Sequence, residues 1–120
     1  MIVNSGKQQL VELISVATAV PFTFIAVGDG GDDTSTSQTQ LDNEVFRKAA
    51  SVNRIGNTLV YTVTFTGDNL TTNVIRELGI FNVATKGATG EKLLARVNFD
   101  TIGPLTSSDE IAFTFRLEVE

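Results

Sequence analysis

Two glutamates of this chain, Glu44 and Glu77, lie inside segments that are expected to be structured, and each has arginines nearby. A pair of carboxylates is the usual machinery of glycoside hydrolysis. Glycosidase sites also present aromatic platforms to the sugar, whereas this chain has no tryptophan and one tyrosine. Arg47, Arg76 and Arg96 can instead satisfy both glutamates as ion pairs. We therefore predict a structural or interface ion-pair network, whose partners lie within one chain or in a neighbouring subunit.

Three aspartates, Asp29, Asp32 and Asp33, fall in a polar, glycine-rich stretch over residues 28–40. Carboxylate oxygens are calcium ligands, which makes these residues the candidates for a metal site. Their spacing is not that of an EF-hand, and Asp and Gly are favoured in solvated turns for backbone reasons. We therefore expect an acidic loop without a cofactor, with Ca²⁺ as the alternative.

The composition excludes several classes of chemistry. The chain contains no histidine and no cysteine, which removes the usual general base, the Ser-His-Asp arrangement and zinc-thiolate sites. We therefore do not expect an enzyme. The formal net charge is -5 and the nine basic residues are scattered, whereas nucleic-acid binding needs clustered Lys and Arg. No segment reaches the ~20 apolar residues that span a bilayer, and the N-terminus does not read as a signal peptide.

The N-terminal part predicts a helical arm over residues 1–20. Leu10, Leu13, Ile14 and Ala17 are spaced to form one apolar stripe, so residues 5–17 are expected to be helical. Pro21 should end the helix. The arm would cover an edge or an open end of the remaining structure.

The rest of the chain predicts strands at short spacing. Apolar or alternating segments occur at residues 22–27, 51–55, 58–66, 74–82, 93–99 and 111–119, with turn signals at 56–57, 67–69 and 86–90. Residues 41–50 read as a short helical or irregular piece leading into a strand, and 101–109 as a loop. The chain is therefore predicted to be one domain over residues 1–120, an antiparallel β-sandwich of about six to eight strands with one N-terminal helix.

The segment at residues 75–82 is unusual for a strand because it contains a charged pair and a glycine. Strict alternation would place two sets of residues on opposite faces: Arg76, Leu78, Ile80 and Asn82 on one, and Ile75, Glu77, Gly79 and Phe81 on the other. Both faces then carry apolar groups, which predicts a strand covered on both sides.

Several pieces of the chain occur in an order that resembles small structural proteins of tailed bacteriophages. These pieces are FIAVGDG at 24–30, LDNEVFRK at 41–48, GNTLVY at 56–61, IRELGIFN at 75–82 and LLARV at 93–97. The resemblance covers most of the chain from residue 22 onward. The acidic loop at 28–40 departs from the Gly-Thr-Gly-Thr type of stretch that is commoner in that group.

The resemblance implies a non-catalytic virion protein, assembled in the host cytoplasm, that acts either as a capsid decoration (cement) protein or as a tail-fibre or baseplate subunit. Its partners would be copies of itself, expected as a homotrimer or another homo-oligomer, and phage capsid or tail proteins. Nucleic acid and membrane are not expected as partners. The alternative is a carbohydrate-binding module for a host surface, for which Tyr61 is the single tyrosine available.

Overall fold

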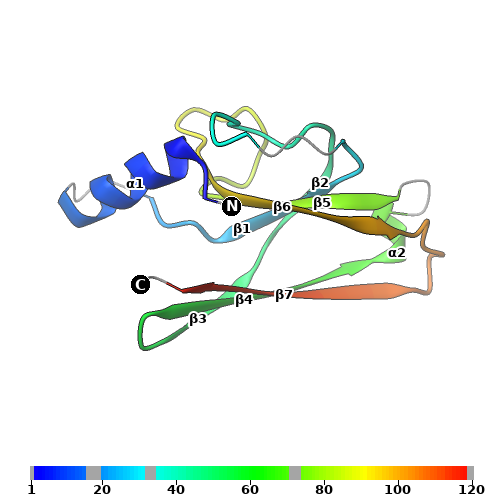
Figure 1. Cartoon of the computed structure of the whole chain (residues 1–120). Helices are drawn as coiled ribbons and strands as arrows, with labels where there is room; N and C mark the ends of the chain where they lie inside the picture. The colour runs from blue at the N-terminus through cyan, green and yellow to red at the C-terminus, as the bar shows by residue number, and fades with distance from the viewer. Residues whose placement is uncertain (1, 16–19, 32–34, 71–73, 119–120) are drawn as a thin grey trace.

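The structure, a computed structural model, describes residues 2–15, 20–31, 35–70 and 74–118. Two antiparallel sheets face each other as two layers, and one helix lies at one end (Figure 1). The predicted mainly β sandwich with one N-terminal helix is confirmed.

The first sheet has the strand order β2-β1-β5-β6. Its strands are β1 (Phe24–Gly28), β2 (Glu44–Ala49), β5 (Ile75–Phe81) and β6 (Leu93–Ile102). Residues 41–50 were expected to be helical or irregular, and this was wrong for most of the segment. Glu44–Ala49 forms strand β2 because it pairs with β1 from Glu44 to Ala49, with a register shift at Val45, and tertiary pairing outweighs weak local preference.

The second sheet has the order β3-β4-β7, built from β3 (Ser51–Ile55), β4 (Thr58–Thr66) and β7 (Glu110–Glu118). Gly56, with φ of 62°, closes the predicted β3–β4 hairpin. A single helical turn, α2 (Gly67–Leu70), stands where a turn was expected. The loop predicted at 101–109 begins later than expected, since β6 continues to Ile102.

The main core lies between the two sheets. It combines Ile25, Val27, Leu78 and Ile80 from the first sheet with apolar residues of β4 and β7 from the second. Phe65 is central, with ring centroids 6.0 Å from Phe46 and 6.1 Å from Phe113 in edge-on contacts. Burial of these aliphatic and aromatic side chains supplies the main stabilisation of the sandwich.

A second, smaller core covers the opposite face of the first sheet. Its buried residues are Val3, Ala26, Leu41, Phe81 and Leu93. The N-terminal segment and the long loop after β1 therefore pack over this face (Figure 1). Strand β5 is covered on both sides, as its sequence predicts.

The predicted alternation along β5 was wrong at its first residue. Ile75 belongs to the core between the sheets, together with Leu78 and Ile80. The register between β5 and β6 shifts between Ile75 and Glu77. Between these two pairs β5 advances two residues and β6 advances four, so a bulge with two extra residues lies on β6 opposite Arg76. At this irregularity Ile75 turns to the inner face, whereas Glu77 stays with Gly79 and Phe81 on the outer side.

The helix α1 (Asn4–Ser15) begins one residue before the predicted start. The predicted end of the helix at Ala17 falls outside the described residues. The start of α1 is fixed to β6: the Val3 amide donates to the carbonyl of Leu94 at 3.0 Å, and a Cβ on Gly6 would lie 2.4 Å from that same oxygen. The arm therefore covers one end of the β6 edge, as expected of it.

Candidate functional site

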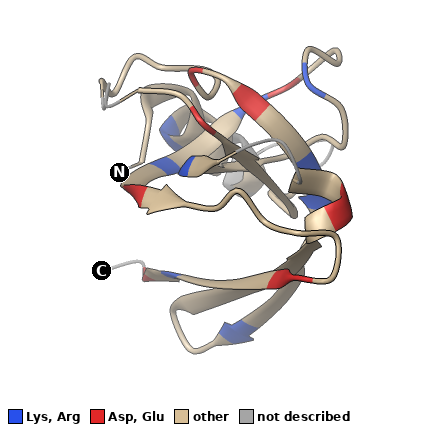
Figure 2. Cartoon of the chain, turned by 90° about the vertical axis from the view of Figure 1, so that its right-hand side faces the viewer, with Lys and Arg blue, Asp and Glu red and all other residues tan. Residues whose placement is uncertain are grey.

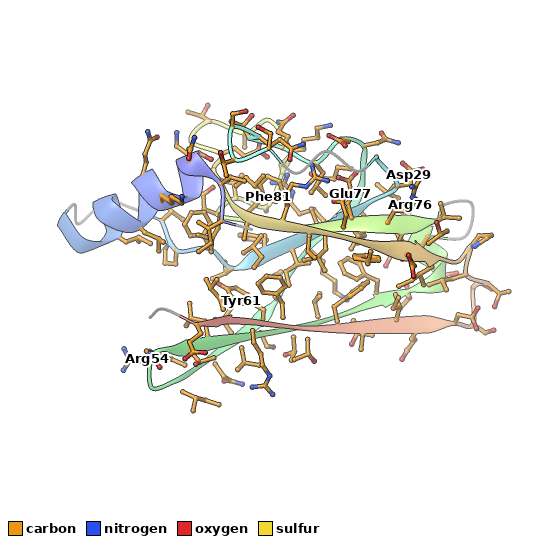
Figure 3. The ribbon with its side chains drawn as sticks, in the orientation of Figure 1. Asp29, Arg54, Tyr61, Arg76, Glu77 and Phe81 are labelled. Atoms are coloured by element: carbon orange, nitrogen blue, oxygen red, sulfur yellow. The ribbon has the colours of Figure 1, made fainter. Side chains whose placement is uncertain are left out.

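The predicted charged residues form two groups on the outer face of the first sheet. The first group, called the Glu77 cluster below, consists of Glu77, Arg96, Asp42 and Asn98. The second, called the Arg47 cluster, consists of Arg47, Glu44 and Glu91. Arg76 is half-buried at the bulge beside Glu77. Figure 3 shows Glu77 on the side of the first sheet that faces away from Tyr61 and the core.

Glu77 is fully buried, and Arg96 is 1% exposed. Nη2 of Arg96 donates to Oε1 of Glu77 at 3.0 Å and to Oδ1 of Asn98 at 2.6 Å. Nη1 of Arg96 lies 3.6 Å from Oδ1 of Asp42, which is partly exposed. The register pairs Glu77 with Asn98 and Gly79 with Arg96, so strand pairing alone brings the buried pair within reach.

The carboxylate of Glu77 also accepts three backbone hydrogen bonds from the loop above it. Oε2 accepts from the amides of Gly30 at 2.8 Å and Asn43 at 2.9 Å, and Oε1 accepts from the amide of Asp42 at 3.0 Å. With Arg96, four donors satisfy one buried carboxylate, which offsets its desolvation. Glu77 therefore ties both ends of the loop between β1 and β2 to the sheet.

The glycines around this loop are explained by close approach. A Cβ on Gly30 would lie 2.3 Å from Oε2 of Glu77, and one on Gly28 would lie 2.3 Å from the carbonyl oxygen of Asn43. A Cβ on Gly79, within β5, would lie 2.9 Å from the side chain of Leu41. These positions need glycine because the loop backbone and Leu41 occupy the space of a side chain.

The Arg47 cluster fixes a second covering segment, the β5–β6 connection. The guanidinium of Arg47 donates to both carboxylate oxygens of Glu44, at 2.9 and 2.7 Å, and pairs with Glu91 at 2.8 Å. It also donates to the carbonyl of Val83 and lies 3.7 Å above the ring centroid of Phe81. Such planar, bidentate and stacked contacts suit arginine specifically.

Of the three aspartates named as candidate calcium ligands, the structure describes Asp29. Asp29 accepts a hydrogen bond from the side-chain amide of Asn43, while Asp32 and Asp33 lie outside the described residues. Among the residues that the structure describes, no three His, Cys, Asp or Glu side chains are grouped so as to hold a metal ion.

Glu44 and Glu77, the candidate carboxylate pair, are committed to different arginines, Arg47 and Arg96. Both oxygens of each carboxylate are hydrogen-bonded within the chain. The arrangement fixes covering loops to a sheet rather than presenting a carboxylate to solvent.

Tyr61, the candidate for carbohydrate stacking, is 1% exposed and lies between the two sheets (Figure 3). Its hydroxyl donates to the carbonyl of Phe22 at 3.0 Å. Burial raises the pKa of Tyr61 through desolvation of the charged form. The ring contacts core residues, including Phe115 at 6.5 Å between centroids.

An apolar pocket of about 200 Å³ opens at the helical end of the sandwich. Leu10 and Leu13 of α1 line one side, and Phe22, Tyr61 and Leu117 line the other. None of the charged residues of either cluster lines it.

Sequence reasoning missed four participants in these clusters: Asp42, Glu91, Asn98 and the ring of Phe81. Asn98 stands two positions after Arg96 on the same strand, so alternation could have placed both on one face. Glu91 lies in a connection without periodicity, and its approach to Arg47 depends on how that connection folds back.

No family model matches the chain, and the curated proteins contain no significant match to it. Within the described residues, no helix is both long and apolar enough to cross a membrane.

Proposed function

We propose that this chain is a non-catalytic structural component of a tailed-phage particle, acting as a capsid decoration protein or as a tail-fibre or baseplate subunit. The observation that carries the proposal is the role of Glu77 and Arg96 in the fold. Both stand in the segments that resemble phage structural proteins, and both serve to hold the loop between β1 and β2 against the sheet.

A fixed loop is useful to an assembly protein. Docking a surface that is already ordered costs less conformational entropy than docking a flexible one. The backbone amides of Gly30, Asp42 and Asn43 are bound by a single buried carboxylate, so the two ends of the loop are pre-organised. Repeated many times on a particle, even weak contacts of this kind become strong through multivalency.

The charge distribution supports an outward-facing position. The chain carries a net charge of -5, and Lys and Arg are interspersed with Asp and Glu along the described chain (Figure 2). An acidic shell protein would repel nucleic acid and would stay soluble while it awaits assembly.

The test is the copy number of this chain in purified phage particles, measured by quantitative mass spectrometry against the major capsid protein. Hundreds of copies would assign it to capsid decoration, and a handful to a few dozen would assign it to the tail. Absence of the chain from intact particles would overturn the proposal.

A further inference from the structure

Strand β7 forms an edge of the sandwich. It pairs with β4 from Glu110 to Glu118, and in the described part of the chain no other strand pairs with it. Nine residues of backbone therefore present a free edge, and such an edge can receive another strand. Charged side chains occur only toward the two ends of β7 (Figure 2).

The apolar interior is open beside this edge. Val97 of β6 pairs with Leu78, a residue of the core between the sheets, so Val97 points toward the second sheet. It is nevertheless 37% exposed. The second sheet has three strands where the first has four. Phe113 and Phe115 on the inner face of β7 are only partly buried. A strand added beside β7 would extend the three-stranded sheet and cover part of this apolar rim.

The polar face of β7 carries two opposite charges, those of Glu110 and Arg116. Glu110 and Arg116 face Thr66 and Val60 on β4. In the described residues, neither side chain makes an ion pair or a side-chain hydrogen bond. Their charges are thus available for a partner across the free edge.

We propose that a second copy of this chain pairs with β7, antiparallel and related by a two-fold axis at Phe113. In this register Phe113 faces the partner's Phe113, and Ile111 faces the partner's Phe115. Glu110 faces the partner's Arg116, and the symmetry makes this ion pair twice. The interface is isologous and closed, as most homodimer contacts are.

Neighbouring registers are less favourable. An axis at Thr114 would oppose Glu110 to the partner's Glu118, which sets like charges against each other. An axis at Phe115 would oppose Arg116 to the partner's Thr114, without any ion pair. A slip by one residue would turn the partner's apolar face outward. Charge complementarity therefore selects both the partner, a second copy, and the register.

This inference rests on the self-association that the proposed function requires, and it identifies a dimer as the basic unit where the phage resemblance implies a homotrimer or another homo-oligomer. The test is sedimentation equilibrium of the purified chain and of charge variants, each checked by circular dichroism for an unchanged fold. The variants are Arg116→Glu, Glu110→Arg and the double exchange, with Arg54→Glu on the opposite edge strand β3 as the matched control.

We expect the natural chain to form dimers, each single variant to weaken dimerisation by about tenfold or more, and the double exchange to restore it to within a few-fold. Arg54→Glu should leave the dimer unchanged. A chain that stays monomeric at high concentration would overturn the inference, as would a dimer that neither single variant weakens or that the double exchange does not rescue. Copy number in particles is measured separately, so a monomer present in particles would refute the dimer and leave the proposed function standing.

Discussion

The guanidinium of Arg96 and the carboxylate of Glu77 meet at 3.0 Å on neighbouring strands, and both side chains are essentially removed from solvent. Gly79, opposite Arg96 in the register, leaves space for Leu41 of the covering loop beside this pair. The pair is therefore the point where sheet and loop are joined, and its removal should affect both.

Glu77→Gln should destabilise the protein by about 3–5 kcal/mol, the usual cost of leaving one member of a buried ion pair without its partner. The side-chain amide of glutamine would also place an N–H₂ group against backbone N–H donors, which in the natural protein donate to a carboxylate oxygen. Urea denaturation of the variant measures this change. Glu118→Gln, an exposed carboxylate on β7, serves as the control and should change stability by less than about 0.5 kcal/mol. A loss below about 1 kcal/mol for Glu77→Gln would contradict the role of Glu77 in joining the loop to the sheet.

Gly30→Ala should destabilise the protein by about 1–3 kcal/mol, because its Cβ would lie 2.3 Å from both Oε2 of Glu77 and Cβ of Asp42. The matched control is the adjacent Gly31→Ala, whose Cβ has its nearest neighbour at 3.7 Å. The control should be close to neutral. Thermal unfolding of both variants decides the point, and equal effects at the two glycines would show that the loop is not held as described.

Arg47→Lys should cost about 1–3 kcal/mol, although the charge is kept. An ammonium group cannot contact both oxygens of Glu44, pair with Glu91 and stack flat on Phe81 at the same time. Arg54→Lys, at an exposed position on β3, makes the same change without these contacts and should be nearly neutral. Comparable losses in the two variants, measured in urea, would argue against a specific role for the guanidinium.

The raised pKa of Tyr61 predicts a loss of stability in alkali. The folded state holds the phenol proton more tightly than the unfolded state, whose tyrosine has the ordinary pKa of about 10. The stabilisation is thus complete below that pH. It declines as the pH rises above about 10, where the unfolded chain releases its proton first.

Tyr61→Phe should flatten this alkaline decline. It should also lose about 1 kcal/mol near neutral pH, because the hydrogen bond to the carbonyl of Phe22 is removed. Stability of both proteins measured by denaturation at several pH values tests this. An unchanged alkaline slope in the variant would show that another group is responsible.

Much of the fold follows from local sequence pattern. The alternation in 111–117, the glycine turn at Gly56 and the spacing of Leu10 and Leu13 each specify an element, because the periodicity of apolar residues must match the geometry of strand or helix. The pattern in Glu44–Ala49 did not specify its strand, since that strand is defined by pairing with β1.

The sequence also predicts which types of residue make up the candidate site. Buried charges need partners, so two glutamates and three arginines in structured segments pointed to ion pairs. The actual pairing, Glu77 with Arg96 and Glu44 with Arg47, depended on strand order and register.

Local sequence pattern specified the helix, the strands other than β2, and the kinds of group that must be paired. Three features depend on how the elements pack: Ile75 turns inward at a bulge, the loop after β1 closes over Glu77, and Glu91 reaches Arg47. These features join residues far apart in the chain. Local pattern reports which face of an element is apolar, whereas long-range contacts depend on how whole elements pack, which no short stretch of sequence encodes.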